Sequence, residues 1–271
     1  PQESVTFINL GCSGARLLNV LQARLGGQSY AGIAPDGYRE PPQLDVVETL
    51  RTRTGRTPDV VYLSAGANDF GFADIAERCA RVSSWTSQTS QCSAELDPVV
   101  KAGDNLLVGT RSRYGDTPTD YGNGRYAAVA NGFTQAGIPN SRVLTSQYPY
   151  PTKKDDGNWC ANIFADTPLG LGRINEVDVR WAGAPGTGPV SVLNNDVAYA
   201  ASRNGWKLVP GIVGDFQTHG YCANNSWIVR YGESPDLQDD GNGTLHPNAG
   251  GTATYATRIR QGVTATGLLP V

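Results

Sequence analysis

Hydrophobic residues in this chain gather in short β-branched runs, and stretches with helical spacing follow most of these runs. The runs predict strands at residues 5–10, 58–65, 142–147 and 206–212. The spacing after them predicts helices at residues 15–25, 71–82, 121–136, 190–204 and 249–261. Strands that alternate with helices are typical of a parallel sheet with helices on both faces. We therefore expect an α/β fold, a three-layer α/β/α sandwich.

The length of the chain limits the number of domains. With 271 residues, 39% of them hydrophobic, the chain can bury one full-sized core and is short for two. We therefore treat residues 1–271 as a single domain. Long insertions at residues 83–119 and 149–189 separate the predicted elements, and we expect the loops to carry the chemistry.

The charge of the chain argues against two classes of partner. Its 22 basic and 25 acidic residues offer no basic field for nucleic acid or an anionic membrane surface. No run approaches the roughly 20 apolar residues that a transmembrane helix needs. We expect a protein with no nucleic-acid partner and no transmembrane segment.

The five cysteines favour an exported protein. Cys79 and Cys92 flank a polar stretch, and Cys160 and Cys222 lie in loop-like surroundings, so we expect two disulfides and secretion. Buried free thiols are the alternative for each cysteine. Cys12 is left over, and its partner is then expected on a segment outside this sequence.

Small and polar residues follow the first two predicted strands, where ligands bind in parallel sheets. Residues 11–15 (Gly-Cys-Ser-Gly-Ala) suit an anion cradle at a helix N-terminus, and a plain strand-to-helix turn is the alternative. Asn68 suits an oxyanion donor, and its alternative role is to cap the following helix. We expect Asp69 to hold this loop by hydrogen bonds rather than to act in catalysis.

Only two histidines can serve as a general base. His246 precedes Pro247, which suits the first turn of the last helix, so its imidazole is expected near the ligand-binding edge of the sheet. His219 lies in a Gly- and Cys-containing loop, and we expect it to be structural.

Two blocks of sequence, at residues 66–69 and 245–247, resemble the SGNH (GDSL-type) hydrolases, and the match is closest to their secreted actinobacterial lipase and esterase branch. Further stretches share this look in the same order, namely residues 9–15, 41–45, 71–75 with Cys79, 147–149, and 216–227. The resemblance covers most of the chain.

The resemblance implies a serine esterase that needs no metal or organic cofactor and acts on a small ester or lipid. It implies Gly14 and Asn68 as oxyanion donors and His246 as the base. The Asp that the family places three residues before the histidine is Gly243 here. We expect the carbonyl of Gly243 to orient His246, with Asp240 as the alternative.

The Gly-Asp-Ser block that supplies the family's nucleophile is absent from this sequence. In the family that strand lies between the strands that here are residues 5–10 and 58–65, so without it two strand edges lose their partners. We favour a missing upstream segment, linked through Cys12. The alternatives are Ser13 as nucleophile, or residues 263–271 in the empty strand position and no hydrolase activity.

The expected function is therefore a secreted esterase or lipase that forms a serine acyl-enzyme. Two other hypotheses stay open, a non-catalytic binding module of the same fold and an O-acyl esterase that acts on polysaccharide. Trp85, Tyr150 and Trp159 in the insertions suit sugars and acyl chains equally well, so they do not decide between substrates.

Overall fold

A three-stranded parallel sheet forms the centre of the protein. The computed structural model describes residues 6–11, 14–21, 41–83, 87–164 and 173–267. The strands β1 (Val61–Leu63), β2 (Val143–Ser146) and β5 (Lys207–Val209) lie in the order β1-β2-β5. All four residues of β2 are buried, as expected for a strand with a neighbour on each side and helices on both faces.

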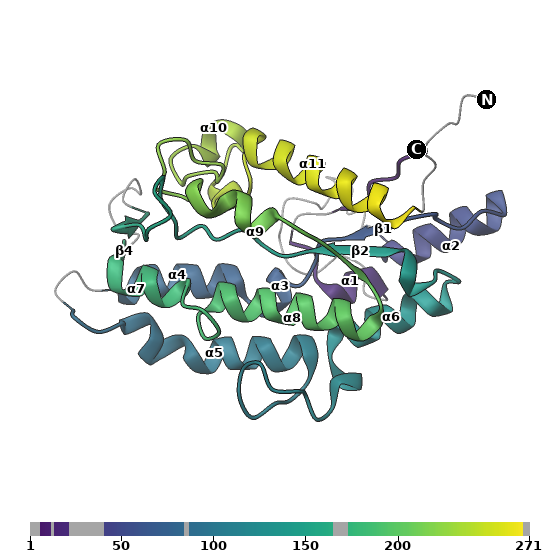
Figure 1. Cartoon of the computed structure of the whole chain (residues 1–271), viewed down its shortest axis with the longest axis horizontal. Helices are drawn as coiled ribbons and strands as arrows, with labels where there is room; N and C mark the ends of the chain where they lie inside the picture. Colours follow the sequence, from purple (N-terminus) through teal and green to yellow (C-terminus); the bar gives the residue numbers. More distant parts are fainter. Residues whose placement is uncertain (1–5, 12–13, 22–40, 84–86, 165–172, 268–271) are drawn as a thin grey trace.

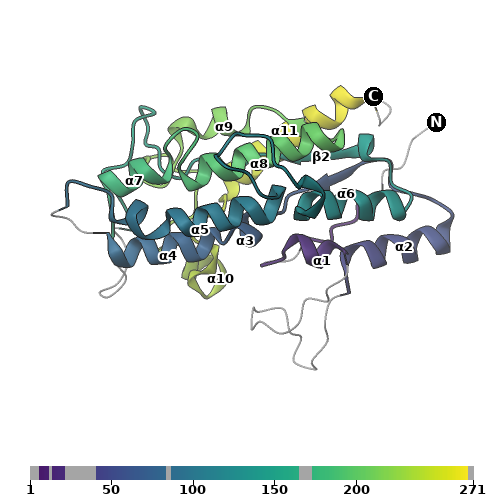
Figure 2. The same ribbon diagram turned by 90° about the horizontal axis from the view of Figure 1, so that it is seen from below.

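Helices cover both faces of this sheet (Figure 1). Helix α11 packs on one face, where Gly262 lies against Leu144 and Val209, and α6 and α8 lie on the other face. Helices α4, α5 and α7 extend beyond the carboxyl ends of the strands in both views (Figures 1 and 2). The helices are α1 (Leu17–Leu21), α2 (Gln43–Thr54), α3 (Ala67–Phe70), α4 (Phe72–Val82), α5 (Gln91–Val108), α6 (Arg125–Gln135), α7 (Glu176–Ala182), α8 (Pro189–Asn204), α9 (Ile212–Asp215), α10 (Ser234–Gln238) and α11 (Ala249–Thr266).

Smaller elements complete the chain. Short 3-10 turns lie at η1 (Tyr121–Asn123), η2 (Asn140–Arg142), η3 (Phe216–Thr218) and η4 (Gly241–Gly243). Strands β3 (Asn162–Ile163) and β4 (Ile174–Asn175) form an antiparallel pair apart from the main sheet.

The α/β architecture predicted from the hydrophobic pattern is confirmed, with β1, β2 and β5 inside three of the predicted strands. The first predicted strand is wrong over its described residues, 6–10, which are not in a strand. Phe7 in this segment is 84% exposed. A strand needs a partner for its backbone groups, and in the described part of the chain β1 pairs with β2 alone. The segment therefore lacks the neighbour that the predicted sheet required.

The sequence pattern missed the longest helix of the first insertion. Helix α5 runs for 18 residues through the region expected to be a long loop, and Pro98 lies inside it. An internal proline removes one backbone hydrogen bond and normally breaks a helix. Here the buried side chains of Leu96, Val100 and Leu107 pack into the core, and this packing outweighs the local preference.

Both expected disulfides are present. Cys79–Cys92 joins α4 to α5, and Cys160–Cys222 links two loops that are 62 residues apart in sequence. Such cross-links are typical of exported proteins. Cys12 lies outside the described residues. Within the described ranges, none of the helices combines the length and the apolar character needed to cross a bilayer.

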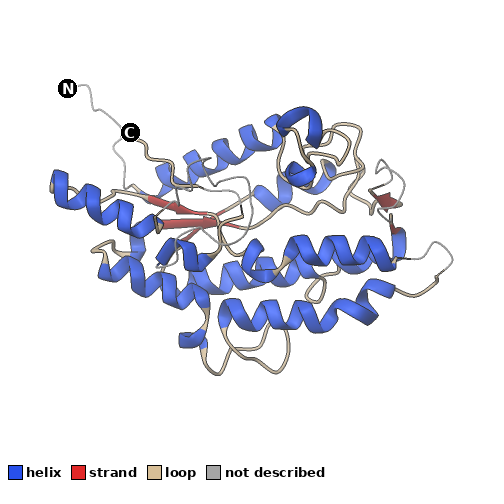
Figure 3. Ribbon diagram, turned by 180° about the vertical axis from the view of Figure 1, so that it is seen from behind, coloured by secondary structure: helices blue, strands red, loops and turns tan. Residues whose placement is uncertain are grey.

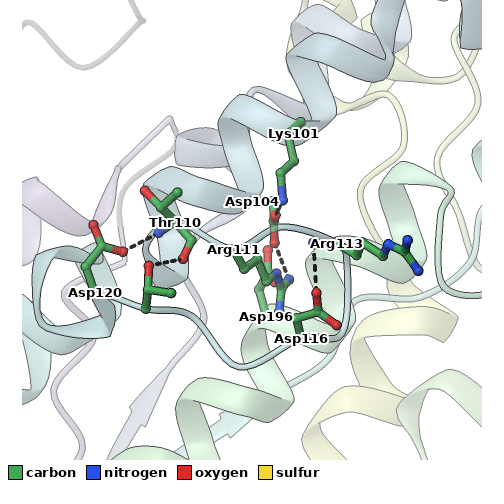
Figure 4. Close-up of polar contacts among 9 residues, drawn as sticks. Lys101, Asp104, Thr110, Arg111, Arg113, Asp116, Asp120 and Asp196 are labelled. Atoms are coloured by element: carbon green, nitrogen blue, oxygen red, sulfur yellow. Dashed lines mark hydrogen bonds and ion pairs between the residues drawn. The ribbon is translucent and has the colours of Figure 1, made fainter.

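A buried charge cluster joins α5 to α8 (Figure 4). Arg111, which is 3% exposed, makes ion pairs with Asp104 of α5 and Asp196 of α8. Lys101 Nζ lies 3.0 Å from Asp104 Oδ2, so Asp104 has two cationic partners. Burial raises the pKa of the Asp196 carboxyl well above its usual range, and the negative charge of Asp104 adds to this rise.

Asp196→Asn is expected to change how stability depends on pH. The raised pKa means that the folded protein holds a proton on Asp196 more tightly than the unfolded chain does. The stabilisation that this tighter proton binding gives is fully present below about pH 4, the ordinary pKa of aspartate. It is lost as pH rises through the pKa of Asp196 in the folded protein. The wild type should therefore lose stability relative to Asp196→Asn as pH rises from 4 to 8.

Urea unfolding at several pH values measures this difference. Asp104, Arg111, Tyr114 and Tyr126 interact electrostatically with Asp196, and Lys101 pairs with Asp104 beside it. A matched series in Asp215→Asn, which removes an ion pair elsewhere, is the control. Equal pH profiles for the wild type and Asp196→Asn would contradict the prediction.

Candidate active site

The carboxyl ends of the three parallel strands meet at one edge of the sheet (Figure 3). The chain continues from β1 into α3 with Asn68, from β2 to Gln147 and Tyr148, and from β5 into α9. This edge is where parallel sheets bind ligands. The loop after β1 is thus placed where the sequence predicted it.

The structure brings the two predicted oxyanion loops together. The Asn68 side-chain Nδ2 donates to the carbonyl of Ala15 at 3.0 Å, next to Gly14. Gly14 has φ 72°, in the left-handed region that favours glycine. An amide Nδ2 carries two N–H groups, so one remains for a ligand while the other holds the loop. Asn68 is exposed and accessible.

Asp69 holds these two loops, as predicted. Its buried carboxylate accepts from the backbone N–H of Leu17 at 2.8 Å and pairs with Arg125. Gly66 has φ 124°, and a Cβ there would lie 2.2 Å from the hydroxyl of Tyr126. That hydroxyl donates to the carbonyl of Ala65 at 2.8 Å. Glycine at position 66 is therefore required by both the backbone angle and the close packing.

His246 has the orientation expected from the sequence. Its Nδ1 lies 3.2 Å from the carbonyl oxygen of Gly243, and the side chain is exposed. Asp240, the alternative, uses its carboxylate within its own loop, accepting from Asn242 N at 2.8 Å and from Gln238 Nε2 at 2.7 Å. These hydrogen bonds lower the pKa of Asp240. An imidazole that donates from Nδ1 to a carbonyl carries its lone pair on Nε2, so Nε2 can accept a proton.

The backbone around His246 is tied to a neighbouring segment. Leu245 N donates to Val229 O at 3.0 Å, and Val229 N donates to His246 O at 2.8 Å. Leu245 has φ 68°, which is unusual for a residue other than glycine. Such a conformation costs on the order of 1–3 kcal/mol and persists where surrounding contacts fix it. The paired segment supplies those contacts.

Tyrosine hydroxyls connect the Asn68 loop to α11, the helix that follows His246. Ala67 N donates to the Tyr148 hydroxyl at 3.4 Å, and the Tyr255 hydroxyl of α11 donates to Gln147 O at 3.2 Å. Burial raises the pKa of both phenols. Both hydroxyls therefore stay protonated near neutral pH; in these contacts Tyr148 accepts and Tyr255 donates. One hydrogen-bond network holds Asn68 and another holds the segment around His246, and these two tyrosines connect them.

Ser64 is a hydroxyl at this edge that the sequence analysis did not single out. It is exposed, directly follows β1, and lies near the phenols of Tyr62 and Tyr148. The predicted strand, residues 58–65, includes Ser64, so the sequence pattern did not place this hydroxyl in a loop after a strand. Ser13, the serine considered from the sequence, lies outside the described residues.

His219 has structural surroundings. Its Nδ1 lies 2.8 Å from the carbonyl of Asn225, and its ring stacks on Trp227 with centroids 3.7 Å apart. The aromatic residues proposed for substrate contact differ in their surroundings. Trp159 packs between Lys153 and Gly183, so its faces are covered, and Trp85 lies outside the described residues.

Comparisons with known proteins add no relative. No family model matches the chain, and neither a curated protein nor a solved structure matches it significantly. Among the residues that the structure describes, no three His, Cys, Asp or Glu side chains gather closely enough to hold a metal ion.

Proposed function

We propose that this protein is a secreted carboxylic ester hydrolase, an esterase or lipase that acts through a serine acyl-enzyme. The observation that carries the proposal is the exposed His246 imidazole, whose Nδ1 faces the Gly243 carbonyl at 3.2 Å. This contact fixes the tautomer in which Nε2 is the base. A second group, the Asn68 side-chain amide beside Ala15, supplies the hydrogen-bond donor that an ester oxyanion needs.

The proposed reaction uses these groups in order. His246 Nε2 takes the proton of a serine hydroxyl as its oxygen attacks the ester carbonyl carbon. Asn68 and the backbone N–H of Gly14 stabilise the oxyanion that forms. The alcohol leaves with the proton from His246, and water then hydrolyses the acyl-enzyme by the same proton transfer. A histidine oriented by a carbonyl, without an aspartate, is sufficient when the oxyanion donors are in place.

The edge of β1 is the place we propose for the nucleophile. Val61 and Tyr62 are half-buried, whereas every residue of the central strand β2 is buried. A further parallel strand along β1 would satisfy the backbone groups of this edge and would end next to the Asn68 loop. We propose that this strand carries the serine and is linked to the chain through Cys12.

A fluorophosphonate probe should label the protein on one serine. The probe forms a stable adduct only with a serine that a neighbouring base activates, so labelling reports the predicted chemistry. Mass spectrometry of peptides locates the adduct, and intact mass with and without reductant detects a second peptide held by a disulfide. We expect the adduct on such a peptide.

Three other outcomes separate the alternatives. An adduct on Ser13 or Ser64 keeps the hydrolase and moves the nucleophile into this chain. If the protein remains unlabelled, whether or not reductant releases a second peptide, the result contradicts the hydrolase function and favours the non-catalytic binding module. Pre-treatment with guanidinium is the control, because an unfolded protein should lose the label.

A further inference from the structure

A groove lies between α9 and α11. Its volume is about 410 Å³, and its walls include Trp227, Asp215, Arg258, Thr254, Thr257 and Gln261. Every one of these side chains is exposed or half-buried. The groove is thus accessible from solvent.

A half-buried aromatic side chain lies at one end of the groove. The Trp227 ring is stacked on His219 at an interplanar angle of 7°, and Phe216 forms a T-shaped pair with it, with centroids 5.3 Å apart. The Asn225 carbonyl holds His219 in this position. Trp227 is therefore fixed before any ligand arrives, and a fixed ring loses little conformational entropy on binding.

The charges in the groove balance each other. Arg258 donates to both carboxylate oxygens of Asp215, with Nε 2.6 Å from Oδ2. These hydrogen bonds lower the pKa of Asp215 and raise that of Arg258, so both groups remain ionised. A neutral ligand fits this pair better than an anionic polymer does, because no positive charge is left over.

Hydroxyl and amide groups continue the groove along α11. Residues 254, 257, 258 and 261 are spaced by three or four positions, so they form one strip on the helix surface. Seven residues of α-helix rise by about 10 Å. An extended chain with many hydroxyl groups can hydrogen-bond along this strip, whereas an acyl chain would cover ionised groups without replacing their water.

The groove begins beside the loop that carries His246. Asn248 N donates to Trp227 O at 2.9 Å, two residues after the histidine. The segment that follows Trp227 pairs with the same loop through Val229 N and His246 O. A ligand lying along α11 would therefore have one end near the loop that carries His246.

We infer that this groove binds a neutral oligosaccharide, and that the alcohol part of the ester substrate is a carbohydrate chain. The second half of the inference rests on the proposed hydrolase function, and the first half does not. The groove thereby favours an O-acylated polysaccharide over a lipid, two substrates that the sequence left open.

Titration with cellohexaose, followed by tryptophan fluorescence and calorimetry, tests the groove directly. Trp227→Ala should weaken binding by at least about tenfold, because the ring is the apolar part of the site. Trp159→Ala is the matched control, since that ring contacts Lys153 and Gly183 and is not among the residues that line the groove. It should bind as the wild type does.

Two further variants keep the test decisive if Trp227→Ala fails to fold. Gln261 is exposed at the far end of the strip, so Gln261→Ala should fold normally and weaken binding by about threefold. Arg81→Met, which changes the surface of α4, should bind cellohexaose unchanged. No binding at millimolar cellohexaose, or equal binding by all variants, would overturn the groove. Binding of cellohexaose without any ester hydrolysis would contradict the proposed hydrolase function and still support the groove as an oligosaccharide site.

Discussion

His246→Ala is expected to lower kcat for a short p-nitrophenyl ester by about 10² to 10⁴-fold, the usual contribution of a general base. The imidazole is exposed, and its Nδ1 faces the Gly243 carbonyl at 3.2 Å, so Nε2 is the nitrogen that we propose accepts the proton. The same variant should slow labelling by a fluorophosphonate in proportion, while KM changes little. Steady-state kinetics and the labelling rate measure the two effects.

The second histidine of the chain provides the matched control. His219→Gln removes an imidazole that stacks on Trp227 and does not face Gly243. It should retain kcat for the small ester within about threefold, because its ring has no proton to transfer in the proposed reaction. Full activity in His246→Ala together with loss in His219→Gln would show that the wrong base was chosen.

Arg111→Met should reduce the free energy of unfolding by about 3–5 kcal/mol. The guanidinium is the shared partner of Asp104 and Asp196, and both carboxylates are fully buried. Without Arg111, the two buried carboxylates keep Lys101 as their remaining cation. Either both stay ionised at a high cost of desolvation, or one of them must take up a proton. Urea unfolding at pH 7 should show a lower midpoint with an unchanged slope.

Arg81→Met is the control for the loss of a positive charge. Arg81 pairs with Glu77 on the surface of α4, where both side chains are more than half exposed. Such a pair contributes only about 0.3–0.5 kcal/mol. If the two variants lost similar stability, the cluster between α5 and α8 would not have the structural role that its burial indicates.

The strands were predictable where local sequence and tertiary packing agree. Val143–Ser146 is a buried β-branched run in the middle of the sheet, and helix α8 ends at Gly205 with φ 73°, as a helix C-terminus favours. Residues 6–10 have the same apolar character, but a strand also needs a neighbour to pair with. Sequence pattern alone does not report whether that neighbour is present.

The candidate site was predictable only in part. The position of Asn68 followed from the rule that loops after parallel strands meet at one edge. Gly14 was placed by the same rule, but residues 6–10 before it are not a strand, so the rule does not explain its proximity to Asn68 through Ala15. The groove did not follow, because Trp227, Asp215 and Arg258 are far apart in sequence and come together only when α9 packs against α11. The charge cluster around Arg111 could not be predicted from the sequence for the same reason.

The edge of β1 has a consequence for the behaviour of the protein in concentrated solution. Unpaired backbone groups on a strand edge are a template for any other chain that can extend beside them. Among the residues that the structure describes, β1 pairs with β2 alone, so Val61 and Tyr62 present such an edge, with β-branched and aromatic side chains that favour strands. A molecule whose edge is occupied is protected from intermolecular β-pairing, so the strand we propose for the nucleophile would also keep the protein from self-association and aggregation.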